Sequence, residues 1–171
     1  STGKIEGMTK NEQSSLFRII GMGALKYHIL KVDPKKRILF DPEVSVDFNG
    51  NTGPFIQYTY VRIRSLLRKV NNHDKKINLL DKIDYREKNI VKHLLLYPEV
   101  IFQAGESYSP ALISNYIYDL VKYFNTFYQN LSIVGTKDTS LKKFRLKLSK
   151  KVSEVIFSGC SLLGIDVPDR M

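Results

Sequence analysis

The fold is decided by one stretch, Asn51-Thr-Gly-Pro-Phe-Ile-Gln-Tyr-Thr-Tyr-Val-Arg-Ile-Arg-Ser-Leu-Leu-Arg-Lys69. Its first four residues complete a turn-forming segment, Asn49-Gly-Asn-Thr-Gly-Pro54. Glycine and proline interrupt regular structure so strongly there that we place a domain boundary at this segment. After the proline, Ile63, Leu66, Leu67 and Val70 recur at helical spacing. We therefore expect a helix from Phe55 to Val70.

The chain beyond this helix keeps a helical pattern to its end. Between 71 and 81 it is polar and rich in lysine, which predicts a mobile loop. Further helices are expected over four ranges: Asp84–Leu96, Glu99–Ala104, 110–131 and Ser140–Leu163, with Gly164 after the last as a C-terminal cap. The sequence thus predicts an all-α helical bundle over residues 52–171.

A separate helical piece precedes the boundary. Thr9 and Glu12 have the spacing of a capping box, which starts a helix that ends before Pro34. Gly21 and Gly23 weaken this helix by about 1 kcal/mol each unless close packing requires them. Residues 38–51 are expected to be extended or irregular. We assign residues 1–51 to a remnant that links the bundle to something else.

Composition narrows the class of protein. The 171 residues suit one domain plus a remnant of another, and the net charge of +10 with a pI near 9.6 attracts polyanions. No apolar run is long enough to span a membrane, and residues 1–15 lack a signal-peptide core. The single Cys160 cannot form an internal disulfide, so we expect a cytoplasmic protein without membrane association.

The residues that usually carry catalysis or hold a metal are not grouped in this sequence. His28, His73 and His93 are scattered, without a cysteine or carboxylate at metal-ligand spacing. Cys160 lies on a core-forming helix and is expected to be a small buried hydrophobe. The glycine pairs fit neither a phosphate loop nor a dinucleotide fingerprint. We predict neither a catalytic nor a metal site.

Cations and aromatics are the more informative signal. No carboxylate occurs from Phe48 to His73, and Tyr58 lies four residues before Arg62, so ring and guanidinium share a helix face. The last helix carries a second acid-free run of six cations: Lys142, Lys143, Arg145, Lys147, Lys150 and Lys151. Such surfaces either track the phosphates of a nucleic acid, remain as solvated faces, or dock an acidic partner as a protein-interaction module.

Four ordered segments carry a family resemblance. The stretch 51–69 resembles the start of the anticodon-binding domain in class I arginyl-tRNA synthetases. Gly23-Ala-Leu-Lys-Tyr27 is similar to the Asp-Ala-Leu-Arg-type helix of that family, with glycine in place of the acid. The pattern Asn115-Tyr-Ile-Tyr-Asp-Leu-x-x-x-Phe-Asn-x-Phe-Tyr128 resembles the family's long helix, and 162–171 resembles its methionine-terminated end.

The resemblance implies a C-terminal fragment of arginine–tRNA ligase whose partner is the tRNA for arginine. The family's His-Ile-Gly-His-like and Lys-Met-Ser-Lys-like motifs do not occur in this sequence. The ATP and magnesium used by the full, monomeric enzyme would then belong to a catalytic domain outside this chain, and the fragment needs no cofactor. The resemblance also implies an anticodon pocket made by Tyr58, Arg62, Tyr128 and the terminal Met171. Second-tier candidates are Gln57, Arg68, Asn125 and Arg170.

Overall fold

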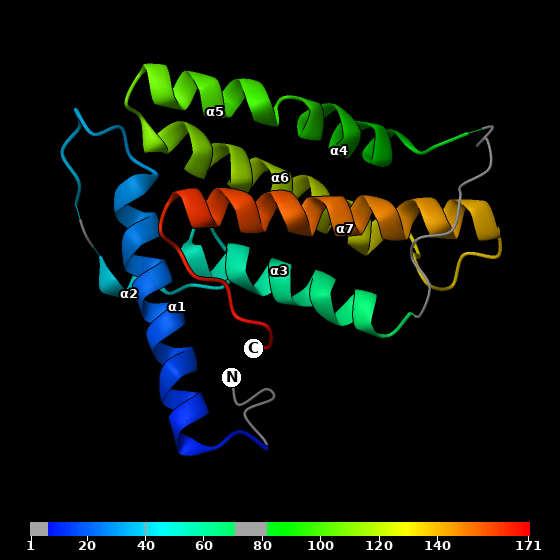
Figure 1. Cartoon of the computed structure of the whole chain (residues 1–171), viewed down its shortest axis with the longest axis horizontal. Helices are drawn as coiled ribbons and strands as arrows, with labels where there is room; N and C mark the ends of the chain where they lie inside the picture. Colours follow the sequence, from blue (N-terminus) through cyan, green and yellow to red (C-terminus); the bar gives the residue numbers. More distant parts are fainter. Residues whose placement is uncertain (1–6, 40, 71–81) are drawn as a thin grey trace.

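Seven helices make up the part of the chain that the computed structural model describes, residues 7–39, 41–70 and 82–171. In chain order they are α1 (Lys10–Leu30), α2 (Pro42–Ser45), α3 (Gly53–Arg68), α4 (Tyr85–Leu95), α5 (Tyr97–Glu106), α6 (Pro110–Asn130) and α7 (Thr139–Leu162). These residues include no strand, so the all-α prediction is confirmed (Figure 1). The loop predicted between 71 and 81 lies outside the described residues.

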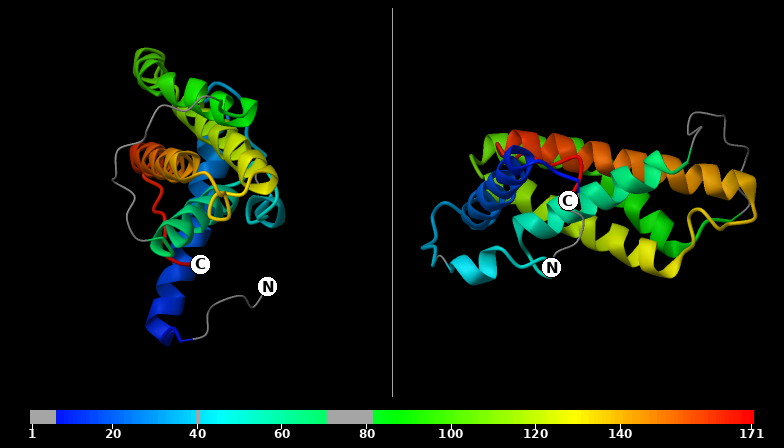
Figure 2. Two further views of the ribbon diagram at one scale, coloured as in Figure 1. Left: turned by 90° about the vertical axis from the view of Figure 1, so that its right-hand side faces the viewer. Right: turned by 90° about the horizontal axis from the view of Figure 1, so that it is seen from below.

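Three long helices, α3, α6 and α7, form the centre of the bundle (Figures 1 and 2). Helices α4 and α5 follow one another along α6, and α1 crosses the beginning of α3 at one end of the bundle. The innermost side chains have no exposed surface; they include Ile63, Ile90, Ile117, Leu120, Phe124, Phe127, Val152 and Ile156. Of the four apolar residues expected at helical spacing on α3, Ile63 and Leu66 are buried, and Leu67 and Val70 are half-buried.

The helix ends follow local chemistry. Thr9 caps α1 in a full capping box, since its hydroxyl accepts from the Glu12 N–H while its own N–H donates to the Glu12 carboxylate. Gly164 ends α7 at a φ of 65°, and the Ile165 N–H returns to the Cys160 carbonyl over 2.8 Å. This is the left-handed glycine cap that the sequence predicts.

The segment between α1 and α3 differs from expectation in one place. Asp41 accepts hydrogen bonds from the N–H groups of Glu43 and Val44, and Pro42 occupies the first turn. These features close a single helical turn, α2, within a stretch expected to be extended or irregular.

Helices α1 and α3 meet through glycine. A Cβ on Gly53 would lie 2.4 Å from the Gly23 carbonyl oxygen, and a Cβ on Gly23 would lie 2.3 Å from Nε2 of Gln57. Around Gly21, in contrast, such an atom would meet nothing within 4 Å. Close packing therefore requires glycine at position 23. At position 21 no contact requires it, so Gly21 only lowers the stability of the helix.

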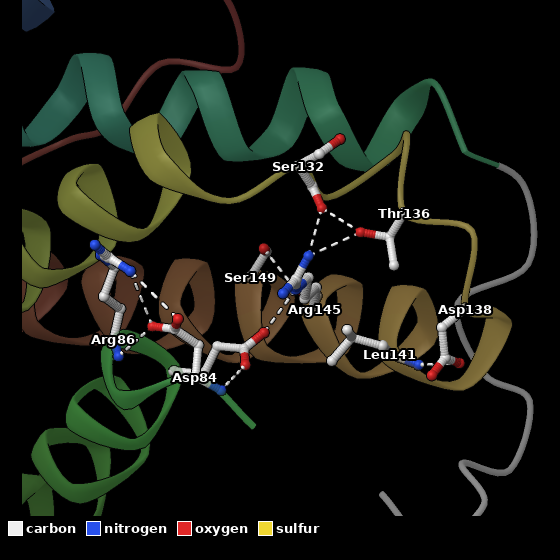
Figure 3. A network of polar contacts seen from close by, with 9 residues as sticks. Asp84, Arg86, Ser132, Thr136, Asp138, Leu141, Arg145 and Ser149 are labelled. Carbon is white, nitrogen blue, oxygen red and sulfur yellow. Dashed lines mark hydrogen bonds and ion pairs between the residues drawn. The ribbon is translucent and has the colours of Figure 1, made fainter. Parts of the chain in front are cut away.

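A buried ion pair joins α4 to α7 (Figure 3). The Nε of Arg145 donates to Glu87 over 2.6 Å, and its Nη1 donates to the Ser132 carbonyl and the Thr136 hydroxyl. Arg145 is only 7% exposed. Its assignment to the cationic surface of the last helix is therefore wrong, because the core needs its guanidinium as an internal donor.

Candidate nucleic-acid interface

Helix α3 presents the acid-free surface. Thr52 caps it by accepting from the Phe55 N–H, and Pro54 stands in the first turn, where its missing N–H costs nothing. Ile56, Ile63 and Leu66 turn toward the core. Because residues four apart share a helix face, this packing leaves Tyr58 and Arg62 together on the outer side.

The Arg62 guanidinium lies between two tyrosine rings. Its Cζ is 4.7 Å from the centre of the Tyr58 ring on the same helix and 5.3 Å from that of Tyr128 on α6. Both distances are within the range of cation–π attraction. Tyr58 remains 41% exposed and Tyr128 38% exposed, so each ring keeps surface that a ligand can reach. The structure thus brings together three of the four residues predicted for the pocket.

Asn125 stands behind this group and is almost fully buried. Its Oδ1 accepts from Arg62 Nη1 over 2.7 Å, and its Nδ2 donates to the Thr59 hydroxyl over 3.0 Å. Both ends of the amide are therefore engaged inside the protein. The expectation that Asn125 itself contacts RNA does not fit this position, and its role is to hold Arg62.

The C-terminal tail passes along a neighbouring face of α3 (Figure 2). Arg68 donates to the Asp169 carbonyl over 3.1 Å, and Arg170 pairs with Glu12 of α1 at 3.1 Å. Met171 is half-buried and packs against the core cluster. Arg68 lies about 100° around the helix from the mean direction of Tyr58 and Arg62, given 3.6 residues per turn. The tail therefore flanks the surface that carries these two residues.

Gln57 is the clearest departure from expectation. It has no exposed surface, and its Nε2 donates to the carbonyls of Ile19 in α1 and Asp166 in the tail, over 3.1 and 2.8 Å. We therefore correct Gln57 from a candidate RNA contact to a residue that ties α1 and the tail to α3. Lys26 adds a further tie by donating to the Gly164 carbonyl.

The other aromatics and cations divide between core and surface. Tyr116 is buried and stacks on His93 at 4.2 Å, whereas Tyr123 is 41% exposed. On α7, Lys151 is exposed and pairs with Glu154 at 2.6 Å, and Lys143 and Lys147 are half-buried. The lysines remain a cationic face of α7, but Arg145 no longer belongs to it.

Two residues near the site were missed by the sequence reasoning. Phe48 meets the Tyr58 ring edge-on, with centroids 6.2 Å apart, and Thr59 supports Asn125 from the core side of α3. Thr59 could have been found from sequence, because it is a polar residue at a core-facing position of an amphipathic helix. Phe48 carried no comparable signal, because its contact depends on how the irregular segment before α3 folds back.

In the described part of the chain, no three His, Cys, Asp or Glu side chains are grouped as metal ligands. Burial raises the pKa of the Cys160 thiol to about 12, which makes it a poor nucleophile. None of the described helices is both long and apolar enough to cross a bilayer.

One family of known proteins matches most of this chain. The family described as the DALR anticodon binding domain matches residues 56–171. Arginine–tRNA ligase of Flavobacterium psychrophilum is 56% identical over 169 residues, which cover 99% of this chain and 28% of that protein. The corresponding protein of Parabacteroides distasonis is 50% identical over 173 residues, covering 99% and 29%. This chain thus spans less than a third of the length of these curated relatives.

Solved structures give the same result. Arginyl-tRNA synthetase of Thermus thermophilus superposes with a TM-score of 0.82 at 28% identity, over 99% of this chain and 29% of that one. The enzyme of Plasmodium falciparum gives 0.80 at 26% identity, over 92% of this chain and 28% of that one. Both similarities cover more of this chain than the matched family range and therefore extend into the residues before 56.

Proposed function

The chain belongs to the DALR anticodon-binding domain family, and from that premise we propose that it is the tRNA-binding part of an arginine–tRNA ligase. In this proposal the bundle grips the anticodon loop of the tRNA for arginine. Residues 52–171 form the binding domain. Residues 1–51 belong to the segment that links it to the catalytic body.

The observation that carries the proposal is the position of Arg62 between Tyr58 and Tyr128. Bases of a single-stranded loop are unstacked, so a protein reads them by stacking them on aromatic rings or guanidinium planes and bonding their edges. The half-exposed tyrosines supply the rings, and Arg62 supplies donors for a base or a phosphate. Met171 and Arg68 would reach the same loop from the side of the tail.

Chemistry belongs elsewhere in this proposal. The full enzyme would activate arginine with ATP and magnesium and attach it to the tRNA, while this part holds the anticodon end. We also propose that the full enzyme acts as a monomer in the cytoplasm. Light scattering and cell fractionation would test these two points.

A filter-binding titration tests the central claim. The chain is titrated against the tRNA for arginine and against the same tRNA altered at the middle anticodon base. We expect the altered tRNA to bind at least about fivefold more weakly, since contacts to one base contribute about 1–3 kcal/mol. Affinity should also fall steeply with salt, because neutralised phosphates release counterions.

The rival function is a basic protein-interaction module that docks an acidic partner. Such a module would bind both tRNAs equally through their charge alone. Equal affinities at all salt concentrations would therefore reject anticodon reading and leave only polyanion attraction. The rival is less favoured because attraction to an acidic surface needs neither the exposed rings nor the stacked guanidinium.

A further inference from the structure

Arg62 is the end of a relay of hydrogen bonds that begins in the backbone of its own helix. The Thr59 hydroxyl donates to the Phe55 carbonyl over 3.0 Å and accepts from Asn125 Nδ2, while Asn125 Oδ1 accepts from Arg62. Thr59 has no exposed surface, and Asn125 is 8% exposed. The relay therefore runs from α3 to α6 and back to α3.

The chemistry of the groups fixes the direction of every bond. A guanidinium only donates, so Asn125 must turn its oxygen toward Arg62 and its NH₂ group toward Thr59. The Thr59 oxygen must then accept, and its own proton is free to go to the Phe55 carbonyl. Without the hydroxyl, the buried Asn125 NH₂ group would lose its acceptor, and the amide would be held in place by its bond to Arg62 alone.

The groups that hold Arg62, the Thr59 hydroxyl and the Asn125 amide, are uncharged, and this affects how Arg62 can bind RNA. A carboxylate in the place of the Asn125 amide would also accept from Arg62, but it would neutralise the guanidinium. The amide holds Arg62 between the rings and leaves its positive charge available to RNA. A buried, uncharged anchor is therefore the kind of support that an RNA-binding arginine needs.

We propose that Thr59 is a positioning residue for RNA binding: its hydroxyl fixes the orientation of the Asn125 amide, which holds Arg62 between Tyr58 and Tyr128. This inference rests on the proposed function of the same site. Thr59 does not contact RNA itself. Its effect passes entirely through Asn125 and Arg62.

Three substitutions separate this role from simple packing. Thr59→Ser keeps the hydroxyl but loses a methyl group, Thr59→Val keeps the shape but loses the hydroxyl, and Thr59→Ala loses both. Affinity for the tRNA should stay within about twofold for Ser and fall about five- to tenfold for both Val and Ala, the scale of one buried hydrogen bond. Thermal stability should fall in all three variants, because Ser and Ala lose packing while Val leaves the Asn125 NH₂ group buried without an acceptor. Full affinity in Val, or an affinity in Ser as low as that in Ala, would overturn the proposal.

An Arg62→Ala background provides the second criterion. There, Thr59→Val should weaken binding by less than about twofold, because the relay has lost its end point. A loss that persists in this background overturns the proposal. If Thr59→Val does not fold, the Ser and Ala variants serve in both backgrounds.

A measurement on the free protein keeps the inference separate from the proposed function. The side-chain amide NMR signals of Asn125 should be preserved in Thr59→Ser and displaced, with faster proton exchange, in Thr59→Ala. If the unmodified chain fails to discriminate the tRNAs, the proposed function fails, and the amide signals still decide whether the relay exists. Unchanged signals in Thr59→Ala would overturn it.

Discussion

Arg145 donates from its Nε to a carboxylate oxygen of Glu87 over 2.6 Å, and the glutamate side chain has no exposed surface. The second carboxylate oxygen accepts from the Asp84 N–H and so caps α4. Through Ser132 and Thr136 the same arginine also holds the connection between α6 and α7 (Figure 3). One ion pair thus joins three parts of the bundle.

Removing one partner of this pair should be strongly destabilising. In Glu87→Gln or Arg145→Met, the remaining charge is buried without compensation, which costs about 3–5 kcal/mol of the free energy of unfolding. Urea denaturation measures this loss. The matched control is Lys151→Met, which breaks an exposed pair and should cost less than about 1 kcal/mol. A loss in the buried variants no larger than that of the control would contradict this account.

Two glycines of α1 should respond oppositely to the same substitution. Gly21→Ala meets open space and should stabilise the chain by about 0.5–1 kcal/mol through helix propensity. Gly23→Ala places a methyl group against Gln57 and should destabilise it by about 1–3 kcal/mol, because Gln57 must give up its bonds to α1 and the tail. Thermal denaturation of both variants is the measurement. Equal effects would mean that the two helices do not meet through Gly23.

Local features of the fold were predictable from sequence. The capping box at Thr9, the break before Gly53, the proline that starts α6 and the glycine that ends α7 all depend on residues within one or two turns of each other. The spacing of Tyr58 and Arg62 is local in the same sense. Each of these predictions needed only the geometry of a helix.

The errors concern contacts between distant segments. Arg145 and Gln57 resemble surface residues in sequence, and only the fold brings Glu87 to the first and the tail carbonyl of Asp166 to the second. Asn125 was selected as an RNA contact, but its partner Thr59 lies 66 positions away. The positions of these polar residues on core-facing sides of their helices indicated that they are buried. Their hydrogen-bond partners could not be predicted from sequence spacing.

Alkaline pH should destabilise the protein through Cys160. Burial raises the pKa of its thiol from 9.0 to about 12, so the folded state favours the neutral form. This stabilisation is complete below pH 9 and is lost as the pH rises toward 12, because the unfolded chain releases the proton first. Burial also raises the pKa of the Tyr27 and Tyr116 hydroxyls, whose contribution begins only near pH 10.

The window between pH 9 and 10 lies below the range in which these tyrosines contribute, and comparison with Cys160→Ala separates the thiol from Lys31, whose pKa is lowered by burial. We expect the free energy of unfolding to fall there by up to about 1.4 kcal/mol per pH unit in the unmodified chain. Cys160→Ala should lower stability at pH 7 by leaving a cavity but should show a flatter profile in this window. Parallel profiles for the two proteins would show that the thiol does not titrate as its burial implies.

The proposed RNA surface is best tested by substitutions at Arg62 and Tyr128, with control substitutions at a similar arginine–tyrosine pair elsewhere. Arg62→Ala and Tyr128→Ala should each weaken binding of the tRNA for arginine by about 1–3 kcal/mol, the scale of stacking and edge contacts. Arg86 lies over the Tyr85 ring at 4.4 Å on α4, so Arg86→Ala and Tyr85→Ala remove a similar pair away from α3. These controls should leave affinity within about twofold once the fraction of folded protein is matched.

Arg62→Lys then separates charge from shape. A lysine keeps the charge but not the planar fork that lies between the rings, so affinity should fall while the salt dependence stays unchanged. Arg62→Ala, in contrast, should also reduce the slope of log affinity against log salt, by up to about 0.7 for one phosphate of a single strand. Filter binding at several salt concentrations measures both quantities. Full affinity in Arg62→Lys would mean that Arg62 acts only as a point charge, and the stacked arrangement would then have no part in reading the loop.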